Sequence, residues 1–183
     1  MDQTNPTLTI TGGSASRLLN PRPAVLVTCC DRNGNPNAIS VAWHTPLSHD
    51  PPLVGISIGL TRYSHELIKA TGEYIINVVG QDMQAAVEFC GERSGRDCDK
   101  LALAGLELRP ARHLRSPVLA GALGHLECQV EQEVLTGDHT FFVGRVLIAE
   151  VRSDCFDKAW VPGSGDVLQC LRLDGYGRFV YGE

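Results

Sequence analysis

Residues 23–43, PAVLVTCCDRNGNPNAISVAW, decide the fold class. Residues 23–30 are apolar and rich in β-branched side chains, which predicts a strand. The pair Asn33-Gly34 in the following segment is the strongest short-range signal of a hairpin turn. Residues 37–43 then predict the returning strand, so this stretch is expected to form an antiparallel hairpin.

The rest of the chain continues this pattern of short strands with a few helices. Residues 1–20 are expected to be a polar arm. Strands are predicted at 53–59 (LVGISIG) and 74–79, and two long β-rich runs at 124–135 and 140–152 surround a turn at 136–139. A helix capped by Thr61 or Ser64 should end at Gly72, and shorter helices are predicted at 83–90 and 99–104. Residues 105–122 look irregular. These strands and helices together predict a mainly β protein, namely a β-barrel with helical insertions.

Composition limits the classes of function. A chain of 183 residues with 43% hydrophobic and 20% charged residues can bury one core. The net charge of −5 and the lack of a basic run argue against nucleic-acid binding. No apolar run is long enough to cross a membrane, and the N-terminus does not resemble a secretory signal, so we expect a cytoplasmic protein.

The seven cysteines are expected to be reduced thiols. They form no Cys-x-x-Cys pair, and no Cys/His pair has zinc-finger spacing, so no metal site is predicted. Cys90 and Cys98 could form a redox pair, or they could be buried and inert, which is the commoner state of free cysteine.

The turn at residues 59–66, GLTRYSHE, is a candidate anion site. A helix start leaves backbone N–H groups unsatisfied and carries the positive end of the helix dipole. Arg62 adds a guanidinium suited to phosphate, and Thr61 and Ser64 add hydroxyl donors. The alternative is an ordinary capped helix with a solvated arginine.

Three further segments could carry chemistry, and each has a structural alternative. Residues 37–52 combine small residues with Trp43, which could hold a flat ring or could belong to the core. Gly137 and Asp138 indicate a turn, which leaves His139 without a structural task. Arg96 and Lys100, in the segment 90–100, could face a phosphate or water.

Together these segments resemble the flavin reductase-like family, and most closely its flavoredoxin branch. The resemblance is carried, in chain order, by PAVLVTCCDRNGNPNAISVAWHTPLSHDPPLVGISIG, TRYSHELIKATGEYIINVV, FCGERSGRDCDKLALAGLE, LECQVEQEVLTGDHTFFVGRVL and the C-terminal GYGR. It implies a six-stranded FMN-binding split β-barrel of Greek-key type. Residues 1–183 would form one domain, with an arm at 1–20 and a tail at 155–183, and the protein would be a homodimer.

The resemblance also implies roles for individual residues. Arg62 and Ser64 would bind the FMN phosphate. Lys100 and His139 would approach the flavin as the catalytic residues, with His139 on the nicotinamide side. The flavin ring and ribityl chain would be lined by Asn37, Ser40, Ala42, Trp43, Thr45, Ser57, Ile58 and Gly59.

The implied function is an FMN-dependent NAD(P)H oxidoreductase, in which NADH or NADPH reduces the flavin. The electrons would pass to an acceptor such as a redox protein or a monooxygenase partner. The alternative is a flavoredoxin-type electron carrier that binds FMN without NAD(P)H turnover. A third hypothesis is a haem-binding module, with His44, His65 and His139 as candidate axial ligands.

Overall fold

A seven-stranded antiparallel sheet forms the centre of the protein. The structure is a computed structural model that describes residues 7–161, 166–173 and 179–181. The strand order in the sheet is β3-β2-β6-β9-β10-β5-β4. The strands are β2 (Val25–Cys30), β3 (Pro36–Val41), β4 (His44–Ser48), β5 (Leu53–Gly59), β6 (Glu73–Val78), β9 (Gly124–Thr136) and β10 (His139–Val151). The mainly β fold predicted from the sequence is confirmed.

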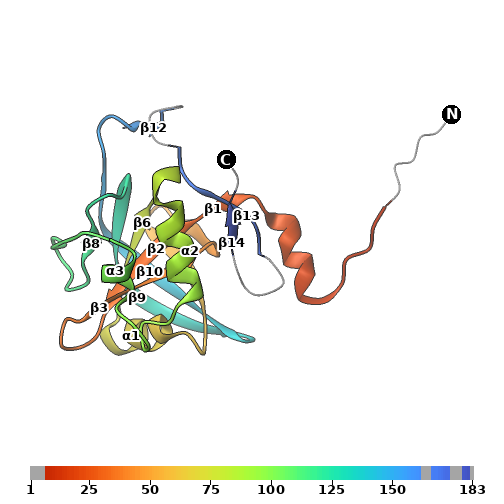
Figure 1. Cartoon of the computed structure of the whole chain (residues 1–183), viewed down its shortest axis with the longest axis horizontal. Helices are drawn as coiled ribbons and strands as arrows, with labels where there is room; N and C mark the ends of the chain where they lie inside the picture. The colour runs from red at the N-terminus through yellow and green to blue at the C-terminus, as the bar shows by residue number, and fades with distance from the viewer. Residues whose placement is uncertain (1–6, 162–165, 174–178, 182–183) are drawn as a thin grey trace.

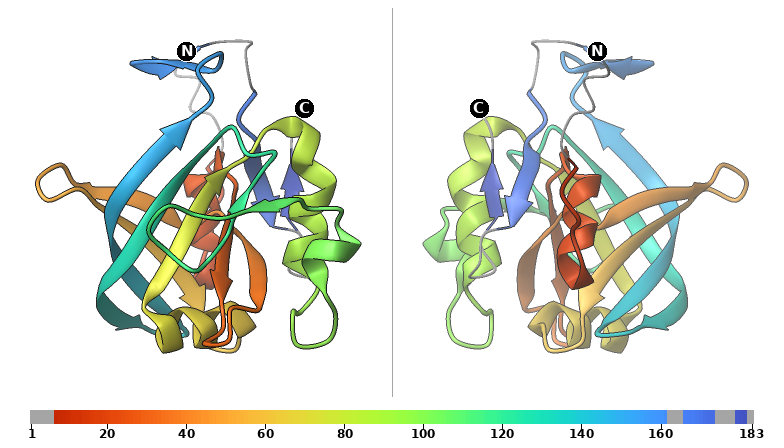
Figure 2. Two further views of the ribbon diagram at one scale, coloured as in Figure 1. Left: turned by 90° about the vertical axis from the view of Figure 1, so that its left-hand side faces the viewer. Right: turned by 90° about the vertical axis from the view of Figure 1, so that its right-hand side faces the viewer.

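The sheet is rolled into a barrel because the chain passes directly from one edge strand to the other (Figure 2). β3 and β4 lie at opposite edges, yet only Ala42 and Trp43 separate them. Three Cα steps reach about 11 Å, whereas a flat sheet with strands ~4.8 Å apart would separate these edges by roughly 29 Å. The Ser57 amide donates to the Trp43 carbonyl at 2.9 Å across the seam.

The helices pack on the barrel at two places (Figures 1 and 2). α1 lies across one end of the barrel, and α2 and α3 lie beside β3. The helical segments are η1 (Gly12–Leu19), α1 (Tyr63–Thr71), η2 (Gln81–Met83), α2 (Gln84–Glu92) and α3 (Lys100–Leu103). None of the helices in the described part of the chain has the length and apolar character needed to cross a membrane.

The ends of α1 correct one prediction and confirm another. Arg62 is the N-cap residue and makes no side-chain capping bond, so neither Thr61 nor Ser64 caps the helix as predicted. Gly72 ends it in the left-handed conformation, with φ of +70°, and its N–H donates to the Ile68 carbonyl at 2.7 Å.

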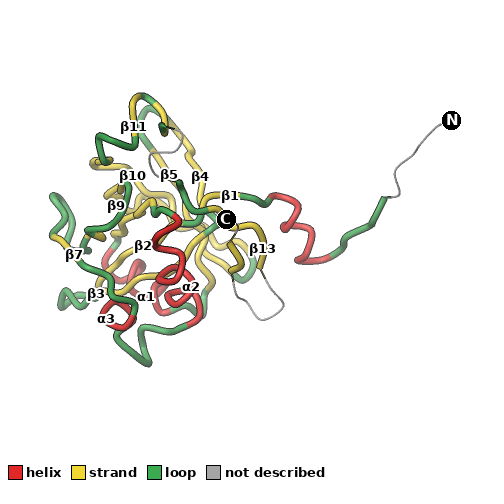
Figure 3. The backbone as a smooth tube through the Cα atoms, turned by 45° about the horizontal axis from the view of Figure 1, so that its top comes forward, coloured by secondary structure: helices red, strands yellow, loops and turns green. Residues whose placement is uncertain are grey.

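Short strand pairs surround the main sheet. β1 (Arg22–Pro23) pairs with β13 (Gln169–Leu173), which pairs with β14 (Phe179–Tyr181). Residues 105–122, predicted to be irregular, contain the two-residue strands β7 (Leu108–Arg109) and β8 (Val118–Leu119). β11 (Phe156–Asp157) pairs with β12 (Ala159–Trp160). Figure 3 shows η1 beyond β1, in the segment predicted to be a polar arm. The GYGR motif at 175–178 falls outside the described residues.

β2 is buried along its whole length, and its side chains are apolar on both faces apart from Thr28, because both faces are covered. Val25 and Val27 belong to the core inside the barrel, together with Phe142. Leu26, which points the other way, packs in a second core with Val87 of α2. The strand therefore lacks the polar alternation of a half-exposed strand.

Both predicted hairpin turns are confirmed. β2 and β3 pair through the turn that contains Gly34, whose φ is +88°. The Asp31 carboxylate accepts from the Asn33 and Asn35 amides, each at 2.8 Å. β9 and β10 pair through Gly137, with φ of +67°, and Asp138. That second turn places His139 at the first position of β10.

Candidate flavin site

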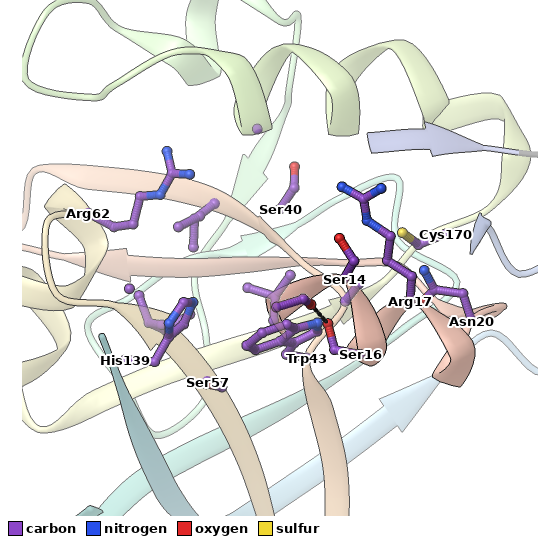
Figure 4. A pocket seen from close by; sticks show the side chains of 17 residues that line it. Ser14, Ser16, Arg17, Asn20, Ser40, Trp43, Ser57, Arg62, His139 and Cys170 are labelled. Atoms are coloured by element: carbon purple, nitrogen blue, oxygen red, sulfur yellow. Dashed lines mark hydrogen bonds between the residues drawn. The ribbon is translucent and has the colours of Figure 1, made fainter. Parts of the chain in front are cut away.

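Two adjoining cavities of about 500 and 210 Å³ lie between the barrel, α2 and the arm. The larger is formed by the ends of β3 and β5, the start of β10 and segment 13–20 (Figure 4). The smaller lies between the start of α1 and segment 90–100. Ile39, Arg62 and Gly91 line both. The predicted residues on the larger cavity are Ser40, Ala42, Trp43, Ser57, Ile58, Gly59, Arg62 and His139, and those on the smaller are Asn37, Arg62, Ser64 and Lys100.

Arg62 stands where the two cavities meet. It follows β5 after a tight turn, in which its amide donates to the Gly59 carbonyl at 3.0 Å. Its guanidinium makes no ion pair or hydrogen bond with the residues that the structure describes. The first backbone N–H groups of α1, which have no partner within the helix, lie next to Arg62. The helix dipole favours an anion at this end of the helix.

Ser64 and Asn37 form a buried pair behind Arg62. The Asn37 Nδ2 atom donates to Ser64 Oγ at 2.7 Å. Asn37 is 4% and Ser64 2% exposed, although both line the smaller cavity. The Ser64 hydroxyl, which was predicted to bind phosphate, therefore already accepts one hydrogen bond. It can still donate its own proton to a phosphate.

The end of β3 supplies the wall of the larger cavity. Ala42 and Trp43 line it at the crossing between the sheet edges. The Ser40 hydroxyl donates to the Val87 carbonyl, so it is used to hold α2 against β3. Thr45 is exposed on β4, donates to the Pro46 carbonyl at 3.2 Å and lines neither cavity.

His139 faces the larger cavity beside Trp43. The two rings have centroids 5.0 Å apart and an angle of 32° between their planes. His139 Nδ1 is 2.8 Å from the Asp138 carboxylate, and this hydrogen bond lowers the pKa of Asp138. Asp138 is 94% exposed and is not among the residues that line the cavity. His139 therefore presents its Nε2 side to the cavity, close to Gly59.

Lys100 belongs to the smaller cavity and not to the compartment of His139. Its side chain is 4% exposed, and Nζ donates to the Cys90 carbonyl at 3.1 Å. Burial lowers the pKa of Lys100, partly offset by the neighbouring thiols of Cys90 and Cys29. The two residues predicted to be catalytic therefore approach different parts of the site.

Several lining residues were missed by the sequence predictions. Five come from the arm, namely Gly13, Ser14, Ser16, Arg17 and Asn20. Their signal was weak, because a polar segment carries no periodic pattern that would place it over a distant cavity. Arg96, considered for a phosphate, instead pairs with Glu66 and lies 5.0 Å above the Tyr63 ring.

A family model described as "Flavin reductase like domain" matches residues 16–164. The chain belongs to the flavin reductase-like family. Among curated relatives, an uncharacterised protein of Archaeoglobus fulgidus is 38% identical over 112 residues, which are 61% of this chain and 63% of that protein. A Streptomyces pristinaespiralis protein named NADH:riboflavin 5'-phosphate oxidoreductase is 30% identical over 122 residues, 67% of this chain and 66% of that protein. The matches thus span under two thirds of either relative's length.

The fold of this flavin reductase-like protein has solved counterparts. A flavoredoxin from Methanosarcina acetivorans superposes with a TM-score of 0.82 at 20% identity, covering 97% of this chain and 92% of that one. At this identity the likeness concerns the fold alone, and it agrees with the split barrel expected from the sequence.

The residues present fit the flavin that the family implies. The larger cavity has the size of a small-molecule site and offers the flat side of Trp43, small side chains and backbone edges. The described residues that line it include no aspartate or glutamate. The unpaired guanidinium of Arg62, where the larger cavity meets the smaller one, is suited to an anionic phosphate.

The haem hypothesis is not supported by the positions of the histidines. His44 Nε2 is bonded to the Pro23 carbonyl at 3.0 Å, and His65 Nε2 to the Thr140 hydroxyl at 2.8 Å. Of these three candidates, only His139 lines either of the two cavities described above.

Proposed function

We propose that this protein is an FMN-dependent NAD(P)H oxidoreductase of the flavin reductase kind. The observation that carries the proposal is the pair of adjoining cavities that meet at Arg62. FMN has a flat ring system at one end and a phosphate at the other, so it needs a broad compartment next to a cationic one. The Streptomyces relative named for riboflavin 5'-phosphate supports FMN as the flavin.

The phosphate end belongs at Arg62. Its guanidinium is free of described partners, and the start of α1 adds backbone N–H donors. Ser64 can donate its remaining hydroxyl proton while it accepts from Asn37. Lys100, in the smaller cavity, adds positive charge from the same side, so its effect on the flavin is electrostatic.

The ring end belongs in the larger cavity. Ala42, Trp43 and segment 57–59 form its wall, whereas Ser40 contributes mainly through its backbone because its hydroxyl holds α2. When bound, FMN supplies the redox chemistry, accepting hydride from the reduced pyridine nucleotide and passing electrons onward. His139 orients the nicotinamide with its Nε2 side, held in place by Asp138. Thr45 is not part of the proposed site.

The phosphate assignment is tested by measuring FMN affinity in two matched variants. Arg62→Ala should raise the FMN dissociation constant about tenfold or more, since a hydrogen bond to a charged group contributes ~1.5–3 kcal/mol. Arg32→Ala removes the same charge from the exposed β2–β3 turn and should leave the affinity unchanged. Equal affinities in the two variants would refute the assignment.

The electron donor is tested by comparing NADH, NADPH and a reduced ferredoxin with the FMN-loaded protein. Rapid reduction by a pyridine nucleotide supports the proposed function. Reduction by ferredoxin alone would favour an electron carrier of the flavoredoxin type. In the proposed function, the reduced flavin passes its electrons to a partner such as a monooxygenase. Coupled oxidation assays can detect this transfer.

We also propose that the protein is a homodimer. Leu47, Leu135 and Leu147 are large apolar side chains left exposed on β4, β9 and β10. By the strand register, Leu135 lies opposite Thr140, at the other end of β10 from Leu147. An interface with a second copy of the chain would cover exposed apolar side chains of this kind. Sedimentation of the purified protein should show twice the mass of one chain.

A further inference from the structure

Two arginines face the larger cavity from opposite sides. Figure 4 shows Arg62 at one side and Arg17 at the other, with Ser40 and Trp43 between them. Arg62 comes from the turn after β5, whereas Arg17 comes from η1 of the arm. Within the described ranges, neither guanidinium has an ion pair or a side-chain hydrogen bond.

The described residues that line the cavity beside Arg17 include polar side chains and no acidic one. Ser14 and Asn20 line the same side of the cavity (Figure 4). The described residues that line the larger cavity include no acidic side chain, whereas Glu92 and Asp97 line the smaller cavity with Arg62. Two cations on a cavity whose described lining has no acidic residue raise its positive potential and favour anionic ligands.

One FMN molecule satisfies only one of these arginines. FMN carries a single phosphate, and the proposed function places it at Arg62, where the smaller cavity and the start of α1 provide further donors. Arg17 is therefore left for a second anion that enters the larger cavity when the flavin is bound. A reduced pyridine nucleotide carries such a group in the diphosphate next to its nicotinamide riboside.

We propose that Arg17, with Ser14 and Asn20, binds the diphosphate of the pyridine nucleotide and so positions the nicotinamide over the flavin side of the cavity. This inference rests on the proposed function. It makes the arm part of the donor site and Arg17 a positioning residue, since it would not touch the reacting atoms. A guanidinium binds phosphate oxygens through two parallel hydrogen bonds, which gives both affinity and orientation.

The test compares Arg17→Ala with the wild type and with Arg32→Ala as the matched loss of charge. Arg17→Ala should raise KM for NADH about tenfold and leave the FMN dissociation constant within about twofold of the wild-type value. Reduction by 1-benzyl-1,4-dihydronicotinamide, a donor without phosphate, should not change. Arg17→Lys should restore part of the NADH affinity. Folding should survive these changes, because η1 has no buried residue.

Other outcomes would overturn the inference. An unchanged KM for NADH would mean that Arg17 binds no part of the donor. If Arg17→Ala bound FMN more weakly, Arg17 would belong to the flavin site. If the variant lost as much reduction by the benzyl donor as by NADH, the arm would only shape the cavity.

A separate binding experiment distinguishes failure of this inference from failure of the proposed function. Calorimetric titration of the FMN-loaded protein with NAD⁺ does not depend on turnover. Weaker NAD⁺ binding by Arg17→Ala would support the inference even if no donor reduced the flavin. No NAD⁺ binding by the wild type would refute it.

Discussion

Asn37 on β3 and Ser64 in the first turn of α1 are joined by a buried hydrogen bond of 2.7 Å. This bond ties together the strand and the helix start that border the proposed flavin site. It also fixes the distance between the wall of the smaller cavity and the backbone N–H groups beside Arg62.

The first prediction concerns this pair. Asn37→Ala or Ser64→Ala should each destabilise the protein by about 1–3 kcal/mol, because the remaining partner is left buried without its bond. The double variant should lose less than the sum of the two single losses, and a double-mutant cycle in urea measures the difference. Thr61→Ala, in the same turn but exposed, is the control. Strictly additive losses would contradict a direct bond.

Much of the barrel could be predicted because its signals are local. Residues 53–59 were predicted as a strand and form β5 with the same bounds. The Asn33-Gly34 and Gly137-Asp138 turns depend on backbone conformations that few residue types adopt, so the sequence reveals them.

The closure of the barrel could not be predicted from local signals. β4 contains Pro46, which lowers the strand signal, and proline is tolerated there because β4 is an edge strand. The crossing at Ala42 and Trp43 joins the two edge strands of the sheet, which only the tertiary structure brings together. Thr45, assigned to the site by resemblance, is carried past it onto β4.

The arrangement within the site also depends on tertiary structure. The prediction that Arg62 lies at a helix start is confirmed, because that position follows from chain order alone, and the proposed anion site depends on it. It could not show that Lys100 and His139 approach different cavities, nor that Arg17 lines the larger one. These relations follow from how α3, β10 and the arm pack, which no short motif encodes.

A second prediction tests the packing between β5 and β10. A Cβ atom on Gly55 would overlap the ring of Phe141 on the paired strand. Gly55→Ala should therefore lower the free energy of unfolding by about 1–3 kcal/mol, the usual cost of overpacking. Gly121→Ala, where the new atom meets only the Met83 sulfur at 3.7 Å, is the matched control. Equal urea midpoints for the two variants would contradict this packing.

The cysteines give a third prediction. All seven lie in the described residues, and Cys98 is the only one that is not buried. Burial raises the pKa of Cys90 to about 11 and that of Cys29 to about 12, so both stay protonated at neutral pH. A thiol reagent should therefore modify one cysteine rapidly, and Cys98→Ser should abolish that phase.

Because Cys90 is buried and protonated, we expect that it is not needed for flavin reduction. Cys90→Ser should keep the wild-type rate, because hydride transfer requires no thiol. A large loss of rate, with FMN still bound, would instead favour a redox role for Cys90 and Cys98.

A fourth prediction concerns stability at acid pH. Burial lowers the pKa of both His65 and His125 below the usual value of about 6.5. The unfolded chain therefore takes up protons first, and stability should fall as the pH drops below about 6.5, by at most ~1.4 kcal/mol per pH unit for each histidine. His65→Gln, which can still reach the Thr140 hydroxyl, should reduce this slope in urea unfolding at pH 7, 6 and about 5. An unchanged slope would show that His65 does not contribute.

The most direct test of the central claim is the visible spectrum of the FMN-loaded protein before and after NADH or NADPH is added without oxygen. We expect the absorption band of oxidised flavin to disappear with at least one of the two donors, and to disappear more slowly at limiting donor in Arg17→Ala. A bound flavin whose band persists with both donors would contradict the proposed oxidoreductase function.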